Sequence, residues 1–149
     1  LAEDFVIGSR AAELGYGVVL SAVVIEHHIG SESLAANFAH RIRWYRSTRR
    51  SRPAGYIGQL FTYPLPLALI TTAVASAWWP LLAVTLVLRY FAARVTARRV
   101  LATRVDSLLL GVEDLLSFGF WIAGFFGNQI TWRGRRYVLG RDGRFQLQA

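Results

Sequence analysis

The side chains that could do chemistry fall into two small groups in the first third of the chain. Glu3 and Asp4 form an acidic pair, and a later cluster holds His40, Arg43 and Trp44. A positioned carboxylate can act as a general base on a hydroxyl group. An arginine fork fits a phosphate, and an indole ring offers a flat surface to a sugar. Because a long uncharged stretch follows, this combination indicates chemistry on an anionic substrate at a membrane surface.

The spacing of the second group suits one face of an α-helix. His40, Arg43 and Trp44 lie at positions i, i+3 and i+4, and residues so spaced are neighbours on a helix surface. Simpler explanations stay open for both groups. Acids are favoured at the start of a helix by its macrodipole. A basic helix beside a membrane contacts anionic lipid headgroups, which is our main interpretation of the arginines from Arg46 to Arg52.

The charge balance and the apolar segments together restrict the class of protein. The net charge is +8, with 17 basic residues, all of them arginine, against nine acidic ones. Such a balance suits nucleic acid or an anionic membrane. The long apolar segments favour the membrane and exclude a nucleic-acid binder, since they would have no place in water. Cysteine is absent, which excludes disulfides and thiolate metal sites.

No metal ligands are assigned in this chain. His27 and His28 lie beside Glu26, but their spacing is poor for a metal and they are better explained as a loop at a strand end. The chain begins at Leu1 rather than at methionine. We therefore expect it to be the C-terminal part of a longer protein.

The first region, residues 1–52, has the pattern of an α/β domain. Helical spacing over 5–14 ends at two glycines, and the apolar, β-branched run 18–25 is typical of a buried strand. Ser31 and Ser33 then precede an apolar-periodic run, which predicts a capped helix that carries the cluster at 40–44. Pro53 ends this helix.

The second region, residues 53–105, predicts a membrane hairpin. No charged side chain occurs from Pro53 to Leu88, a stretch longer than the roughly 20 residues that one crossing requires. Tryptophans at 78–79 followed by Pro80 favour a turn at the bilayer interface. We expect two spans, at about 59–77 and 80–98. Because basic segments flank the hairpin on one side, that side is predicted to be cytoplasmic.

The third region, residues 106–149, holds another apolar segment and a basic tail. The segment 108–126 contains Glu113 and Asp114, which are unfavourable inside a bilayer, so it either re-enters the membrane or spans it. Arg89 falls near the middle of the second span and requires a partner, and Asp114 or Glu113 could supply it. Residues 137–145 have the pattern of a small β-hairpin.

The order of these segments resembles a known enzyme family. The acidic pair, a strand, a motif like Q/R-x-x-R-W at 40–44 and C-terminal membrane helices are similar to the ceramide glucosyltransferase-like family, among the family 21 and family 2 glycosyltransferases. Within it, the bacterial hopanoid branch (bacteriohopanetetrol glucosamine biosynthesis) is nearest. The segments that carry the resemblance are 3–5, 15–21, 40–44, 49–56 and 132–134. Each motif is short, but their order and spacing cover nearly the whole chain.

The resemblance implies a GT-A domain on the cytoplasmic face of the inner membrane, with a multi-pass anchor. Its substrates would be a UDP-sugar donor and a lipid alcohol such as a hopanoid or a ceramide-like lipid. Asp4 would match the family's catalytic base, with Glu3 beside it. Arg43 and Trp44 would match the R-W of the motif, near the donor diphosphate and the acceptor. His40 stands where glutamine or arginine is usual, although a histidine can also donate to a phosphate.

The resemblance also implies a divalent cation, Mg²⁺ or Mn²⁺, whose ligands would lie upstream of this chain. We therefore expect this part alone to bind the donor poorly and not to turn over. Two alternatives stay open. One is a small non-catalytic basic membrane protein that binds anionic lipids, for which Asp4 and Trp44 would be dispensable. The other is a fragment of a processive polysaccharide synthase, which would normally have more spans.

Overall fold

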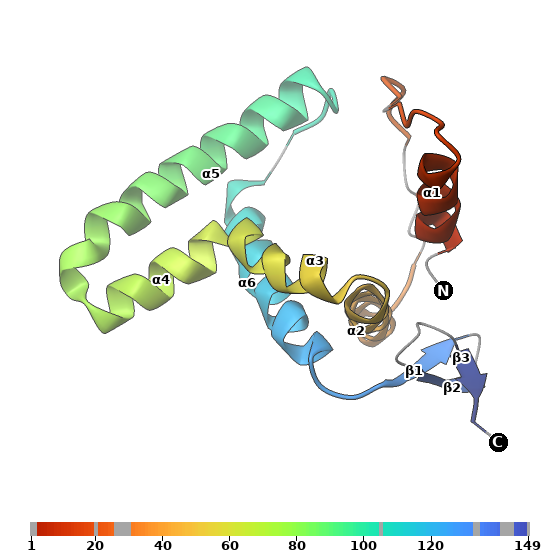
Figure 1. The fold of residues 1–149 in the computed structure, drawn as a ribbon. Helices are drawn as coiled ribbons and strands as arrows, with labels where there is room; N and C mark the ends of the chain where they lie inside the picture. The colour runs from red at the N-terminus through yellow and green to blue at the C-terminus, as the bar shows by residue number, and fades with distance from the viewer. Residues whose placement is uncertain are drawn as a thin grey trace. The chain divides into compact units, whose positions relative to one another are not determined.

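The computed structural model describes residues 3–19, 21–25, 31–104, 106–132, 135–140 and 145–148. These residues form a mainly helical chain with a small sheet at its end (Figure 1). In chain order the elements are α1 (Glu3–Glu13), α2 (Leu34–Ser51), α3 (Pro53–Gly58), η1 (Gln59–Thr62), α4 (Pro64–Val74), η2 (Ser76–Trp78), α5 (Trp79–Arg99), α6 (Ser107–Gly124), β1 (Gln129–Trp132), β2 (Arg135–Leu139) and β3 (Phe145–Leu147). They divide into two compact units, Leu1–Tyr56 with Ala123–Ala149, and Ile57–Ile122.

In the first unit, α2 confirms the helix expected from the serine cap and the apolar spacing. The Ser33 hydroxyl accepts a hydrogen bond from the Ala36 amide at 3.2 Å, which satisfies one of the free amides at the helix start. The helix ends at Ser51, and Pro53 begins the short α3. A proline lacks the amide donor that would continue α2.

Among the described residues of 1–52, the structure shows no strand at 18–25 and therefore does not show the predicted α/β character. The described part of this region contains two helices, and residues 18–19 and 21–25 adopt no regular structure. Their apolar side chains are exposed, with Val19 88% accessible. A strand requires a neighbouring strand for its backbone hydrogen bonds. No described strand pairs with this run, so its β-branched composition alone does not make it one.

Two arginines of α2 bind the backbone where α6 ends. The Arg46 guanidinium donates to the carbonyl oxygens of Phe126, at 3.0 Å, and of Gln129. Arg49 donates to the carbonyl oxygens of Phe125 and Gly127. All four acceptor residues come after Gly124, the last residue of α6, so the two arginines hold the link between α6 and β1. A cation this close to the C-terminus of a helix also interacts favourably with the helix dipole. We call Arg46 and Arg49 the carbonyl clamp.

Two glycines allow the backbone to approach α2 at this point. Gly127 has a φ of +75°, and a Cβ there would lie 2.9 Å from the Arg46 guanidinium. A Cβ at Gly124 would overlap the hydroxyl of Tyr56, which is fully buried. The Tyr56 ring packs edge-on against Phe125, with ring centroids 5.0 Å apart. A side chain at Gly124 would therefore force α2 or α3 away, whereas one at Gly127 would strain the backbone and displace the Arg46 guanidinium.

A three-stranded antiparallel sheet follows the clamp in the order β1-β2-β3. In β1, Ile130 faces Tyr137 of β2, and in β2, Leu139 faces Phe145 of β3. Ile130 and Leu139 are buried, while their strand neighbours are more exposed. The pairing of β2 with β3 confirms the hairpin expected at 137–145, although its turn lies outside the described residues.

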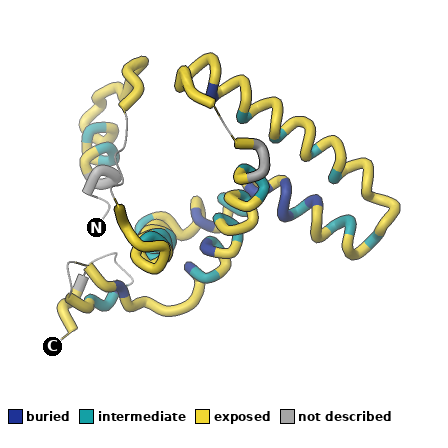
Figure 2. Tube along the Cα trace, turned by 180° about the vertical axis from the view of Figure 1, so that it is seen from behind, coloured by how far each residue is buried: buried dark blue, intermediate teal, exposed yellow. Residues whose placement is uncertain are grey.

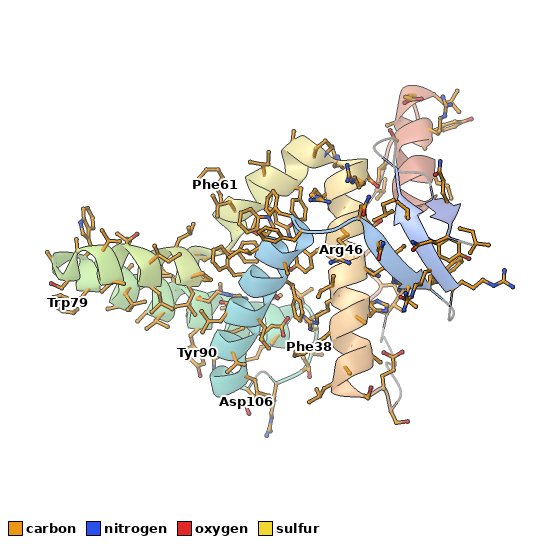
Figure 3. The ribbon with its side chains drawn as sticks, turned by 90° about the horizontal axis from the view of Figure 1, so that it is seen from below. Phe38, Arg46, Phe61, Trp79, Tyr90 and Asp106 are labelled. Carbon is orange, nitrogen blue, oxygen red and sulfur yellow. The ribbon has the colours of Figure 1, made fainter. Side chains whose placement is uncertain are left out.

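The second unit contains the expected two-helix hairpin, with a shorter first arm. Helices α4 and α5 are joined by η2 and pack together, with Trp79 at the tip (Figures 1 and 3). Both arms begin with a proline at the first or second helical position, which suits its fixed φ. The stretch Pro53–Thr62 is bent by 67° from α4. This break at Tyr63 is why the first arm begins at Pro64 and not near residue 59.

An ion pair joins α5 to α6, as the unpartnered charge of Arg89 predicted. The guanidinium of Arg89 binds both oxygens of Asp114, at 2.8 and 2.7 Å. The side chain of Asp114 is 12% exposed and that of Arg89 is 35% exposed. A bidentate pair of this kind fixes both position and orientation. Asp114 and not its neighbour Glu113 makes this bond, and α6 is thereby docked against α5.

Within the described residues, one helical stretch is long and apolar enough to cross a bilayer. It runs over Ser76–Arg99, and the bent pair Pro53–Thr62 and Pro64–Val74 would make a second if it counts as one span. These lengths and compositions are weak evidence for a membrane location.

The carbonyl clamp predicts a difference between two faces of α2. Arg49→Met keeps most of the side-chain stem but removes the donors to Phe125 and Gly127. Hydrogen bonds from a charged donor contribute about 1.5–3 kcal/mol, and we expect a loss of about 1–2 kcal/mol because water can partly replace them. The midpoint of thermal unfolding in detergent should fall by several degrees. Arg43→Met, the same change on the other face, should leave it nearly unchanged, and equal shifts would contradict the clamp.

The ion pair predicts energetic coupling between α5 and α6. Asp114→Asn leaves the charge of Arg89 without its partner, so this change alone should destabilise the second unit. Arg89→Met added to Asp114→Asn should restore part of that stability, with a coupling of about 1–3 kcal/mol in a double-mutant cycle. As a control, Arg94→Met should add to Asp114→Asn without coupling, because Arg94 donates to the Tyr90 hydroxyl instead. Additive effects of the first pair would show that the pair does not hold the helices together.

Candidate functional site

The three residues of the predicted binding cluster meet on one face of α2. A nitrogen of the Arg43 guanidinium lies 3.1 Å from Nδ1 of His40. The imidazole stacks on the indole of Trp44, with ring centroids 5.6 Å apart and planes 29° from parallel. Trp44 is 63% exposed and His40 is also exposed, while Arg43 is half-buried. The cluster is thus an assembled, accessible surface with a cation at one side and a flat aromatic face at the other.

The contact between Arg43 and His40 fixes which ring nitrogen carries the proton. A guanidinium has only donors, so Nδ1 of His40 must accept this bond. The neutral imidazole then carries its proton on Nε2, which leaves that nitrogen as a donor to a ligand. Arg43 retains further N–H groups beyond the one that binds His40. The cluster therefore offers several converging donors, the arrangement that a phosphate oxygen requires.

The carbonyl clamp lies on a different face of the same helix. Successive residues turn by about 100°, which places Arg46 and Arg49 roughly 140° around the axis from the centre of the cluster. Figure 3 shows Arg46 extending from α2 towards the segment that leads into β1. Because one face is held by backbone carbonyls, the other is presented in a fixed direction. The clamp thus positions the cluster without being part of it.

The electrostatics of the clamp differ from those of an exposed basic stretch. Partial burial, and then the nearby positive charge of Arg50, lower the pKa of Arg49 from its ordinary value. Arginine stays protonated over any accessible pH. The partly buried charge of Arg49 therefore depends on its hydrogen bonds to the carbonyl oxygens for stabilisation. The sequence suggested lipid contact for these arginines and missed this role. The only local indication was Gly127, a glycine just past a helix end, where the chain often turns back.

The acidic pair lies at the beginning of α1. Glu3 and Asp4 belong to the first turn of that helix, but their side chains fall outside what the structure describes. The general-base role of Asp4 and the supporting role of Glu3 therefore stay predictions. His27 and His28 also lie outside the described residues, as do Arg133 and Gly134. Trp132 ends β1, with its ring 6.3 Å from that of Tyr137.

A divalent cation finds no site in the part of the chain that the structure describes. No three side chains of histidine, cysteine, aspartate or glutamate gather there into a group that could hold a metal ion. The described residues therefore do not fit the cation that the family resemblance implies.

Comparison with known proteins gives one match, to a protein family. Searches of curated proteins and of solved structures found no match. The family profile described as glycosyl transferase family 21 matches residues 1–145, nearly the whole chain. The matched range includes the acidic pair, α2 with its cluster and the clamp, the helices α3 to α6, and the sheet except the end of β3. The chain therefore belongs to glycosyl transferase family 21.

Proposed function

We propose that this chain forms the C-terminal part of an enzyme that moves a sugar from a UDP-sugar to the hydroxyl group of a lipid. The observation that carries the proposal is the assembled, exposed cluster of His40, Arg43 and Trp44 in a chain of this family. In the reaction, the bond between the sugar and the diphosphate breaks, and a bond from the sugar to the lipid oxygen forms. The proton of the lipid hydroxyl passes to a carboxylate.

The cluster suits the donor side of that reaction. Negative charge grows on the departing diphosphate, and fixed donors aimed at that charge lower the barrier. Arg43 supplies a permanent cation, and His40 supplies an N–H at Nε2. Trp44 offers a face on which a sugar or the acceptor can rest. Since the His40 ring is held between the other two side chains, the donors are oriented before a substrate arrives.

Asp4 serves the acceptor side as the general base, with Glu3 beside it. A lipid hydroxyl is a weak nucleophile at neutral pH, and a carboxylate in contact with it removes its proton as the new bond forms. The acceptor is a hopanoid or a ceramide-like lipid, reached at the cytoplasmic face of the inner membrane. The divalent cation stays part of the proposal, with ligands other than the residues described.

The base role predicts a selective loss of activity. In the full-length enzyme, Asp4→Asn should reduce transfer of label from UDP-sugar to extracted lipids by about 10²–10⁴-fold, the usual contribution of a general base. Recovery of the protein in the membrane fraction should not change. Glu13→Gln provides the control, because it removes an exposed carboxylate of the same helix, one that pairs with Arg10. Near-normal transfer by Asp4→Asn would remove Asp4 from the reaction.

The cluster predicts separate effects for its cation and its ring. Arg43→Lys keeps the charge but loses the planar fork. The kcat of this variant should therefore fall, while its membrane insertion and its free energy of unfolding should stay nearly unchanged. Trp44→Phe should keep partial activity, because a smaller aromatic face remains, whereas Trp44→Ala should raise the KM for one substrate. Initial rates at varied donor and acceptor concentrations would check both. If the Arg43→Lys and Trp44→Ala enzymes match the unaltered one, the alternative of lipid-headgroup contact by α2 would replace the binding role.

A further inference from the structure

We propose that the α4–α5 hairpin enters only one leaflet of a phospholipid membrane and does not cross it. In this arrangement Arg89, Glu113 and Asp114 lie at the level of the lipid headgroups, and the hairpin tip at Ser76–Trp79 lies near the middle of the bilayer. The occupant of the exposed apolar surface is the acyl region of the leaflet that faces the enzyme. This goes beyond the proposed sugar transfer and stands without it, because it rests on the second unit alone.

The uncharged arms of the hairpin have the length of one leaflet. Helix α4 has 11 residues, which is about 16 Å at the rise of an α-helix. The part of α5 from Trp79 to Leu88, before the first arginine, is about 15 Å long. The hydrocarbon core of a bilayer is about 30 Å thick, and apolar segments of 10–14 residues more often re-enter than span. The 67° bend before α4 prevents the preceding helical residues from extending that arm.

The charged residues of α5 begin at Arg89 and continue to the end of the helix. Arg89 follows Leu88 directly and binds Asp114, while Glu113, the neighbour of Asp114, is exposed. A complete crossing by α5 would place this group near the bilayer centre, where each charge is unfavourable. Past Arg89, the exposed residues Arg94, Arg98 and Arg99 continue the helix as a basic surface. Such a surface complements anionic lipid headgroups next to an inserted apolar segment.

The apolar arms lack protein cover in their own unit. Along α5, Val84, Val87 and Leu88 are each more than half exposed, and Trp79 is 65% exposed at the tip. Figure 2 shows exposed residues along most of this hairpin, with buried ones on α4. An exposed apolar surface of this extent marks an interaction site. The basic residues that border it identify that partner as an anionic membrane.

A complete crossing is the competing arrangement and makes a different prediction. Ser76–Arg99 is long enough to span, which would place Trp78 and Trp79 in the far headgroup region, where tryptophan is favoured. The two arrangements differ most at the tip. Half insertion makes Ser76, in η2, one of the deepest positions of the hairpin, and a complete crossing makes it one of the shallowest.

The test measures depth at single cysteines in the full-length protein, whose described chain contributes none of its own. Ser76→Cys, Ala83→Cys, Ala92→Cys and Thr96→Cys would each be labelled with an environment-sensitive fluorophore, in a background with any upstream cysteines replaced. The protein would be placed in vesicles of phosphatidylcholine and phosphatidylglycerol. Nitroxide lipids quenching at the headgroup, at an intermediate depth and near the bilayer centre would report the depth of each position. Ala77→Cys replaces Ser76→Cys if that variant does not fold.

We expect the deep quencher to be most effective at Ser76, the intermediate one at Ala83, and the shallow one at Ala92, with Thr96 open to aqueous quencher. Shallow quenching at Ser76 with deep quenching at both Ala83 and Ala92 would overturn the proposal in favour of a complete crossing. Shallow quenching at all four positions would overturn it in favour of surface contact. Because the readout is depth, loss of sugar transfer in any variant affects the proposed function and not this result.

Discussion

The first unit depends on how the backbone carbonyl groups between α6 and β1 find partners. Carbonyls outside helices and sheets have no partner in regular structure, so they need a donor from a side chain or from water. Arg46 and Arg49 supply the donors from α2, which ties two segments about 80 residues apart in sequence. The glycines at 124 and 127 are required because this contact is made by backbone. The direction in which α2 presents its other face follows from that attachment.

The second unit depends on a different interaction, the ion pair that neutralises the charge of Arg89 in the largely apolar helix α5. Arg89 and Asp114 neutralise each other in a bidentate pair, and the pair is the polar contact that joins α6 to the hairpin. An unpaired charge among apolar side chains has an unfavourable desolvation free energy, both in a protein interior and in lipid. The same interaction therefore decides both how the helices pack and at what level the apolar arms end.

Several elements followed from the sequence because their causes are local. Ser33 and the apolar spacing after it were enough to place α2, and the i, i+3, i+4 spacing brought His40, Arg43 and Trp44 together. The partner of Arg89 was also predictable, because few acids were available to a charge in that position. The hairpin of β2 and β3 followed from its turn residues.

Other features depend on segments far apart in the chain and left no local pattern. Residues 18–25 have strand composition, but a strand exists only with a neighbour, and no described strand pairs with them. The roles of Arg46 and Arg49 depend on carbonyl groups whose nearness no spacing rule reveals. The break before α4 at Tyr63 was concealed by a continuous apolar composition. For Asp4, the sequence supplies a role by resemblance, and the distance from its carboxylate to the cluster is fixed by tertiary structure alone.

Because α2 carries the cluster on one face and the clamp on another, any change in the number of residues between them alters the angle between the two faces. One residue inserted between Trp44 and Arg46 would rotate the cluster by about 100° relative to the clamp, although no functional side chain would be lost. Seven inserted residues would nearly restore the angle, because they complete about two turns, but would shift the cluster by about 10 Å along the axis. The spacing between the two groups is therefore a constraint of its own. Substitutions between them can be tolerated where a change in length cannot.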